Sequence, residues 1–346
     1  MTIRRTRCVA TTLAPARRTV RDASPRLRAA ISEPRRAALN WRCYHDFVRI
    51  RVLGSAAGGA FPQWNCGCSN CSAVRAGDPR VRRRTQDSLA VTAGRGRWHL
   101  INASPDILRQ IESTPDLEPR GARDSPIHSI VLSNGDLDHV LGLFSLRESW
   151  PLTVYATSAV RRGLERHNAI CRTLHRFSGQ LVWRELEFHR EVEIDEGLTI
   201  EARPAAGKLP VHLMGIYQPS PEDNASLWLR DKRTEKRAAY IGATSSAEEW
   251  IGALAGIDCV FFDGTFWSSD ELIRLGLSSA RAEDMAHLPI GGNGGSLLLL
   301  KASAPTRRIY THINNSNPIL VEGSPEYRAV LEAGCEIAVD GMEVTL

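Results

Sequence analysis

The stretch of sequence that decides the fold is Ser133-Asn134-Gly135-Asp136-Leu137-Asp138-His139. An apolar run at 129–132 predicts a strand before it, and the pattern over 140–149 predicts a helix after it. A loop at the carboxyl end of a strand commonly holds ligating or catalytic side chains, because several of them can converge there on one point. The acids and the histidine of this loop are therefore the first candidates for the chemistry of the protein.

Outside this loop the chain consists of short β-like runs separated by turns rich in Gly, Pro and Asn, with a few amphipathic stretches between them. The expected strands are 48–53, 88–92, 98–102, 129–132, 153–156, 181–186, 198–202, 212–217, 226–229, 239–241, 259–262, 308–312 and 336–339. The expected helices are 105–111, with Ser104 as its N-cap, 140–149, 158–167, 247–255 and 296–302. This order favours an α+β fold, an αββα sandwich in which two packed sheets are flanked by helices.

The chain of 346 residues has a net charge of +5, which originates at its beginning. Residues 1–45 hold 11 Arg and 2 acidic residues, a net charge of +9, which leaves −4 for the remainder. Because the Arg-rich segment has no apolar period, we predict a disordered extension over 1–46 and one domain over 47–346. The slightly acidic body argues against a nucleic-acid groove. No apolar run approaches the roughly 20 residues that a membrane span requires.

A second constellation is formed by Cys66, Cys68 and Cys71, three of the eight cysteines of the chain. Eight unevenly spaced cysteines are too few for a disulfide framework in a chain of this length, which indicates reduced thiols. Thiolates this close in sequence can converge on one Zn²⁺, whose tetrahedral site then needs a fourth ligand from elsewhere. The alternative is a set of incidental thiols in a loop.

The loop at 133–139 resembles the His-x-His-x-Asp-His loop of the metallo-β-lactamase superfamily, which lies in the same strand-to-helix setting. On that template Asn134 and Asp136 stand where two histidines of a first metal site would be, whereas Asp138 and His139 match unchanged. The resemblance implies the metallo-β-lactamase fold, which is an αββα sandwich.

Three later segments resemble further landmarks of the superfamily. Residues 204–208 resemble its Pro-x-x-Gly-His turn, with Lys208 in place of the histidine. Residues 240–244 resemble its Gly-Asp-Thr stretch, with Ala243 in place of the metal-bridging aspartate. His312 ends a strand in the way that the last metal-binding histidine of the superfamily does. By this resemblance the first metal site has lost its ligands and the second has kept them.

The ligands that remain on this template are Asp138, His139 and His312. Two histidines and one carboxylate that leave the other positions of a metal open are the ligand set of non-haem Fe(II) oxygenases. A hydrolase in which two metals share a bridging hydroxide would be crippled by the losses at the first site. The alternative is that Asp138 caps the helix and that His139 is a buried core residue.

From about residue 48 to the C-terminus, the chain resembles the pyrroloquinoline quinone biosynthesis protein B family. The resemblance is carried by Val52–Cys66, Asn102–Ile107, Ser145–Glu148, Phe262–Trp267 and His312–Pro318. It implies a cytoplasmic protein of the pathway that converts a Glu and a Tyr of a small ribosomal peptide into the redox cofactor. The implied role is either O₂-dependent hydroxylation of the tyrosine-derived ring of the Glu-Tyr precursor or carriage of the cofactor or its precursor toward the periplasm. The ligand set favours the hydroxylase with Fe(II), and a hydrolase with a single zinc is a third hypothesis.

Four further residues receive predicted roles. His287 lies where related nucleases keep a histidine for proton transfer, and we predict that it deprotonates the ring. The alternative is a surface or packing histidine. Lys208 places a cation where the first metal would be, and we predict that it holds a carboxylate or phenolate of the substrate. Asp136 is predicted to accept a hydrogen bond from a ligand histidine. Asn315 stands where some relatives place a histidine as the fourth ligand of a structural zinc, although a nearby acid or water remains an alternative. The sequence leaves open whether the chain forms a homodimer or binds other proteins of the pathway.

Overall fold

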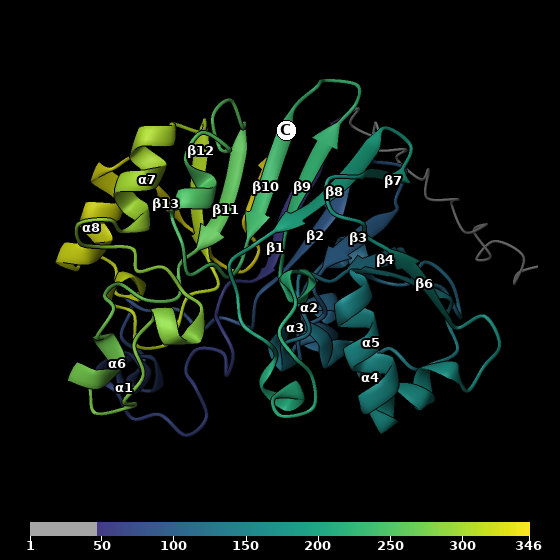
Figure 1. Cartoon of the computed structure of the whole chain (residues 1–346), viewed down its shortest axis with the longest axis horizontal. Helices are drawn as coiled ribbons and strands as arrows, with labels where there is room; N and C mark the ends of the chain where they lie inside the picture. The colour runs from purple at the N-terminus through teal and green to yellow at the C-terminus, as the bar shows by residue number, and fades with distance from the viewer. Residues whose placement is uncertain (1–46) are drawn as a thin grey trace, which may run out of the picture. The chain divides into compact units, whose positions relative to one another are not determined.

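The computed structural model describes residues 47–346, whose strands form two seven-stranded sheets (Figure 1). The first sheet contains, in spatial order, β14 (Glu343–Thr345), β1 (Arg49–Gly54), β2 (Ser88–Thr92), β3 (Trp98–Ile101), β4 (Ile127–Val131), β5 (Leu152–Ala156) and β6 (Leu181–Glu185). The second contains β13 (Glu336–Ile337), β12 (Arg307–Thr311), β11 (Cys259–Asp263), β10 (Arg237–Ile241), β9 (Ala225–Asp231), β8 (Leu198–Pro204) and β7 (Glu191–Asp195). The predicted extension at 1–46 lies outside the described residues.

Each sheet has a parallel and an antiparallel part. Strands β3 to β6 run parallel in the first sheet, and strands β10 to β13 run parallel in the second. The remaining neighbours pair antiparallel. The carboxyl ends of parallel strands share one edge of a sheet, where ligands are commonly bound. The segments after β4, β11 and β12 start at such edges, and they carry the candidate ligands.

Helices cover the outer faces of the two sheets. The α-helices of the described residues are α1 (Ser69–Ala76), α2 (Ile107–Glu112), α3 (Leu137–Val140), α4 (Gly142–Ser145), α5 (Ser158–His167), α6 (Glu271–Arg274), α7 (Ser296–Ser303) and α8 (Pro325–Glu332). None of them is both long and apolar enough to cross a membrane.

The core alternates between the two faces of each strand. In β11, Phe261 packs with apolar residues of both sheets, whereas its neighbour Phe262 packs on the opposite face with Leu300 of α7 and Val330 of α8. The outer face of the first sheet carries its own buried cluster with residues of α2, α4 and α5. This period of two follows from strand geometry. The αββα sandwich predicted from the sequence is therefore confirmed.

Several predicted elements are wrong in kind or in extent. Residues 212–217 form no strand. A short 3₁₀ turn at Val211–Leu213 covers the start of this segment, and the exposed side chains of Met214 and Ile216 after it do not serve a core. The helix predicted at 247–255 is only a 3₁₀ turn at Glu248–Trp250, because the chain at Gly252 takes a left-handed φ of 79°.

Two other helices begin or end differently from their predictions. The helix predicted at 140–149 is replaced by α3 and α4. At the first residue of α4, the backbone of Gly142 passes so close to the Ser104 carbonyl that a Cβ would lie 2.3 Å from that oxygen. Helix α2 begins at Ile107 with Asp106 as its N-cap, whereas the hydroxyl of Ser104 accepts the N–H of Asp106 at 3.3 Å.

Candidate metal centre

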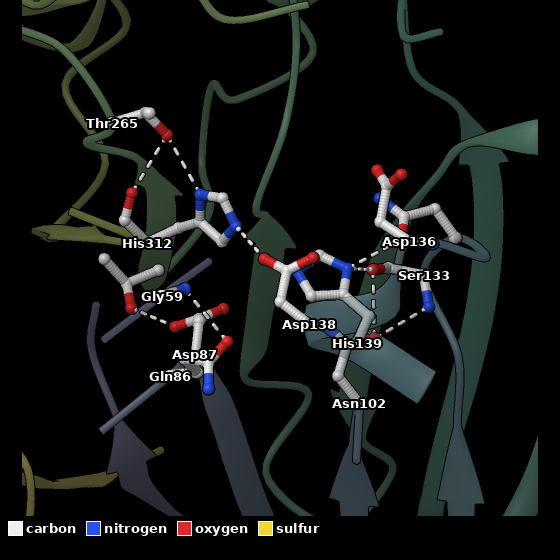
Figure 2. Close-up of polar contacts among 12 residues, drawn as sticks. Gly59, Gln86, Asp87, Asn102, Ser133, Asp136, Asp138, His139, Thr265 and His312 are labelled. Atoms are coloured by element: carbon white, nitrogen blue, oxygen red, sulfur yellow. Dashed lines mark hydrogen bonds and ion pairs between the residues drawn. The ribbon is translucent and has the colours of Figure 1, made fainter. Parts of the chain in front are cut away.

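The three predicted ligands meet where strand ends of the two sheets face each other. Asp138 and His139 lie in α3, soon after β4 of the first sheet, and His312 follows β12 of the second. Nε2 of His312 lies 3.2 Å from Oδ2 of Asp138, and Nε2 of His139 lies 3.8 Å from the same oxygen (Figure 2). The ligand atoms all lie within 4.8 Å of one another, which is close enough for one metal ion. The N-cap of α3 is Asp136, so the alternative of Asp138 as a helix cap is wrong.

The side chain of His139 is only 1 % exposed, and its two ring nitrogens have different surroundings. Nδ1 lies 2.7 Å from Oδ1 of Asn134, which also accepts the N–H of Asp136. Because this oxygen only accepts, Nδ1 carries the hydrogen and Nε2 keeps a lone pair. That buried Nε2 has no hydrogen-bond partner in the part of the chain that the structure describes. An unpaired buried nitrogen costs roughly 1–3 kcal/mol, which a metal ion bound there would offset, so the donor set fits a metal.

His312 is held in place by its backbone and by a hydroxyl. It adopts a left-handed φ of 54°, which is unfavourable for a residue with a Cβ. Its Nδ1 lies 2.9 Å from Oγ1 of Thr265, and that hydroxyl donates to Oδ1 of Asp263 at 2.6 Å. Nδ1 of His312 is therefore the donor to Thr265, and Nε2 points toward Asp138. Partners of this kind fix the ring orientation of a ligating histidine.

The charges of the centre shift the pKa values of its members in opposite directions. Burial alone would raise the pKa of Asp138, but His139 and the hydrogen bond from His312 outweigh it and hold that pKa well below its usual range. Burial would lower the pKa of His312, but the hydrogen bond and charge of Asp138 raise it to about 9. Burial lowers the pKa of His139. Without a metal, Asp138 and His312 therefore form a buried ion pair.

A second group at the same place is formed by Asp263, His287 and His312, and Asp263 is a residue that the sequence analysis missed. Oδ2 of Asp263 lies 2.9 Å from Nδ1 of His287, and its Oδ1 accepts the N–H and the hydroxyl of Thr265. Both oxygens are thus engaged, so we interpret Asp263 as an orienting residue for the two histidines rather than as a metal ligand. The only signal for it was its place at the carboxyl end of a strand.

The residues at the former first-site positions line a cavity of about 300 Å³ beside the ligands. Asp136, Lys208 and His287 all contribute to its wall. Asp136 makes no hydrogen bond to a histidine among the described residues, and Figure 2 shows its carboxylate turned away from the ring of His139. The predicted acceptor role of Asp136 is therefore wrong. The acceptor is Asn134, because its amide oxygen lies within hydrogen-bond distance of Nδ1 of His139.

The three cysteines also come together. The sulfur atoms of Cys66, Cys68 and Cys71 lie within 4.8 Å of one another at the start of α1. The side-chain amide of Asn315 faces all three, with Nδ2 3.2, 3.6 and 3.4 Å from their respective sulfurs. Burial raises the pKa of Cys71 to about 12, and the neighbouring thiols of Cys68 and Cys66 act in the same direction. Three thiols and one amide around a common point are consistent with a closed tetrahedral site.

Comparisons with known proteins agree with this architecture. Residues 97–313 match the family model described as the Beta-lactamase superfamily domain. Coenzyme PQQ synthesis protein B of Azoarcus sp. is 41 % identical over 305 residues, which cover 86 % of this chain and 100 % of that protein. The protein of the same name from Pseudomonas putida is 39 % identical over 301 residues, which cover 86 % of this chain and 99 % of its own.

Solved structures point the same way. The crystal structure of Zn²⁺-bound PqqB from Methylobacterium extorquens is 38 % identical and has a TM-score of 0.81, covering 86 % of this chain and 100 % of that one. A diphosphatase from the PhnP family, 20 % identical with a TM-score of 0.61 over 86 % of this chain and 97 % of that one, shares the fold. The chain therefore belongs to the Coenzyme PQQ synthesis protein B family, within the β-lactamase superfamily.

Proposed function

We propose that the protein catalyses O₂-dependent hydroxylation of the tyrosine-derived ring of a Glu-Tyr precursor during PQQ synthesis, at one Fe(II) ion held by Asp138, His139 and His312. The observation that carries the proposal is the ligand set around one point, with a buried Nε2 of His139 that has no partner among the described residues. Two histidines and one carboxylate leave several metal positions open, as in non-haem iron oxygenases. The names of the relatives support the pathway.

The surroundings of the ligands favour one metal over two. A two-metal hydrolase needs ligands on both sides of a bridging hydroxide. Here the oxygen of Asn134 is occupied by His139 and by the N–H of Asp136, and Lys208 brings a positive charge into the same cavity. A second cation there would meet the positive charge of Lys208 and, of the former histidine positions, only the carboxylate of Asp136 as a ligand.

The residues around the cavity would bind the ring and take its proton. Fe(II), when bound, supplies the activation of O₂, one atom of which enters the ring while the other leaves as water with two electrons from an external reductant. Asp263 accepts the Nδ1 hydrogen of His287, so Nε2 of His287 is free to accept the proton of a phenolic hydroxyl. The ammonium group of Lys208 would hold a carboxylate or phenolate of the precursor.

We further propose that Cys66, Cys68 and Cys71 hold a structural Zn²⁺, with Asn315 as the fourth ligand. Rotation of the Asn315 amide by half a turn would bring its oxygen to the position where Nδ2 now faces the sulfurs. Asn70 of α1 donates to the backbone oxygens of Asn315 and Asn317 at 3.2 and 3.0 Å, so the same helix holds the segment that follows His312.

The test is the oxygen uptake of anaerobically prepared, Fe(II)-loaded protein after addition of the cross-linked or linear Glu-Tyr precursor, a reductant and isotopically labelled O₂. We expect uptake that depends on the precursor and a product that carries one labelled oxygen atom. Stoichiometric binding of the precursor without uptake would support a carrier instead. Turnover of phosphodiesters or lactones with Zn²⁺ alone would support a hydrolase.

The substrate role of Lys208 is tested separately with Lys208→Met, which keeps the length of the side chain and removes its charge. We expect the KM for the precursor to rise about 10-fold, because a charge-assisted hydrogen bond to the substrate contributes roughly 1.5–3 kcal/mol. Unchanged affinity and unchanged turnover would remove this role.

A further inference from the structure

A buried carboxylate that is not a ligand lies near the metal centre. Asp87, directly before β2 of the first sheet, is 0 % exposed. Its Oδ2 accepts the hydroxyl of Tyr240 at 2.5 Å, and its Oδ1 accepts the hydroxyl of Thr311. Tyr240 lies in β10 and Thr311 in β12, so the carboxylate of one sheet is bound by two strands of the other. A charge buried this deeply is costly unless its surroundings compensate for it, and here the two hydroxyl groups provide that compensation.

A chain of hydrogen bonds leads from the ligand His139 to Asp87. Nδ1 of His139 lies 3.3 Å from the hydroxyl of Ser133, and that hydroxyl donates to Oδ1 of Asn102 at 3.0 Å (Figure 2). Nδ2 of Asn102 then donates to the hydroxyl of Tyr240 at 3.0 Å, which donates in turn to Asp87. The single Nδ1 hydrogen of His139 is directed at Asn134, at 2.7 Å, and Ser133 receives only its weaker, longer branch. From Ser133 onward, each donor points toward the carboxylate of Asp87.

The direction of these hydrogen bonds affects how strongly His139 can bind a metal. A ligating histidine commonly donates its second N–H to a carboxylate, which fixes the tautomer and makes the metal-bound nitrogen more basic. Aligned hydrogen bonds in a low-dielectric interior polarise one another, so the carboxylate of Asp87 can act on His139 through the intervening groups.

Asp87 also holds the second ligand-bearing segment. Thr311 directly precedes His312 in the chain, so the bond from its hydroxyl to Asp87 fixes the end of β12. His139 and His312 belong to different sheets, and their separation depends on how the two sheets meet. The carboxylate of Asp87 is connected to the segment of His139 through Tyr240 and to the segment of His312 through Thr311.

The backbone is strained at two residues that the network contacts or precedes, Asn102 and His312. Asn102 and His312 adopt left-handed φ angles of 61° and 54°. Such positions persist where the surrounding structure fixes them, and they cluster at functional sites. A Cβ on Gly242 would lie 2.2 Å from the hydroxyl of Tyr240, so only glycine leaves room for that hydroxyl.

We propose that Asp87 is a positioning residue of the metal centre, which sets the orientation of His139 through Tyr240, Asn102 and Ser133 and the position of His312 through Thr311. This proposal rests on the metal centre proposed above. It assigns a role in metal binding to residues that do not contact the metal.

The experiment compares wild type, Asp87→Asn and Tyr240→Phe with a matched control, Asp195→Asn. Asp195 is buried and also pairs with a histidine of the first sheet, with its Oδ2 3.5 Å from Nε2 of His99, but it is not among the hydrogen-bond partners of the proposed ligands. Each protein, with Zn²⁺ retained at Cys66, Cys68 and Cys71, is titrated with Co(II), whose visible absorption reports the geometry of the bound ion, and each is unfolded in urea with the Asp138 centre free of metal. The KM and kcat of the Fe(II) form are measured where precursor is at hand.

We expect Tyr240→Phe to weaken Co(II) binding about 10-fold and to change the absorption spectrum, whereas Asp195→Asn leaves both unchanged at a similar loss of stability. Should Asp87→Asn fail to fold, Tyr240→Phe, which removes one oxygen atom, decides the matter. An unchanged Co(II) affinity and spectrum in Tyr240→Phe, with loss of stability alone, would overturn the positioning role. A wild type that binds no Co(II) at Asp138, His139 and His312 would overturn the metal centre itself and this proposal with it.

Discussion

The two clusters of candidate metal ligands differ in where their members come from. Cys66, Cys68 and Cys71 lie within six residues of one another, and only Asn315 comes from a distant segment. Asp138 and His139 come from the first sheet and His312 from the second, so three ligands depend on the packing of two sheets. The first cluster is a local structure that α1 completes, whereas the second exists only in the assembled sandwich.

The two clusters also differ in their surroundings. The sulfurs enclose a point with the amide of Asn315 on the remaining side, the arrangement of a closed structural site. The Asp138 cluster faces a cavity of about 300 Å³ on one side and a hydrogen-bonded network on the other. A closed site of this kind suits a structural ion, whereas the cavity beside the Asp138 cluster leaves room for a small molecule.

The largest expected effect is on the open site. His139→Ala should abolish iron binding and turnover while the Zn²⁺ content stays at one per chain, because the variant removes a ligand of only one cluster. Elemental analysis after anaerobic loading with Fe(II) measures both metals. The control is His99→Ala, which removes a histidine that is also only 1 % exposed but lies outside the centre. Loss of zinc in His139→Ala would show that the two clusters are not independent.

The next effect is on stability. Cys68→Ser should release the zinc and lower the free energy of unfolding by about 4 kcal/mol, the size associated with loss of a structural metal. Because Asn315 follows His312 by three residues, we also expect weaker iron binding in this variant. The open cluster would then depend on the cysteine cluster, but not the reverse. Urea unfolding and iron titration measure the two effects, with Cys335→Ser as the control at a buried cysteine outside the cluster. Iron binding equal to that of wild type would separate the clusters completely.

A smaller effect is expected where a hydroxyl orients a ligand of the open site. Thr265→Val keeps the shape of the side chain but removes the acceptor of Nδ1 of His312. We expect metal affinity to fall about 10- to 100-fold, as for other groups that orient a ligand histidine. Thr265→Ser should restore the affinity in the same titration. If Thr265→Val binds metal like wild type, the left-handed backbone at His312 orients the ring unaided.

The sequence indicated the candidate ligands better than the residues that hold them. Asp138, His139 and His312 were predicted from the resemblance to the metallo-β-lactamase superfamily, and the structure brings their ligand atoms within 4.8 Å of one another. Asp263 and Asp87 were missed because their roles depend on partners far away in the chain, as with Asp87 and Tyr240. Asp136 was given a role that belongs to Asn134, since the direction of a side chain within a loop does not follow from spacing.

Among the secondary structure, the buried strands were the most predictable. Strand β2 was predicted with its observed bounds, whereas β7 and β14 were missed. β7 alternates acids with apolar residues at an edge, where exposure weakens the pattern. The exposed apolar residues at 211–216 produced a false strand, since an apolar pattern does not say whether it is buried. The fold class followed from the order of elements and tolerated both errors.

The smallest expected effect is a change of stability with pH, which arises from the ion pair between Asp138 and His312 in the iron-free protein. The pKa of His312 is about 9 in the folded, iron-free protein, above its ordinary value of 6.5. Its charged form therefore stabilises the fold fully below pH 6.5, and this contribution is lost as the pH rises through 9. The lowered pKa values of Asp138 and His139 act only below pH 6.5, so they do not contribute in this range. Since one pKa unit corresponds to about 1.4 kcal/mol, we expect a loss of about 2 kcal/mol between pH 7 and 9.5.

Urea unfolding at the two pH values, with zinc retained at the cysteines and iron absent, measures this loss. His312→Gln should show a clearly smaller loss, and so should iron-loaded wild type, because a ligating imidazole is already deprotonated. A residual loss near pH 9 is expected in all forms, because burial raises the pKa values of the thiols of Cys171, Cys259 and Cys335 above their ordinary value of 9.0. Iron binding at pH 7 should release close to one proton from His312, which calorimetry in buffers of different ionisation enthalpy detects. A step of equal size in His312→Gln would assign the titration to another group. The metal-free open cluster would then lack the ion pair between Asp138 and His312, which is the feature that distinguishes it from the cysteine cluster.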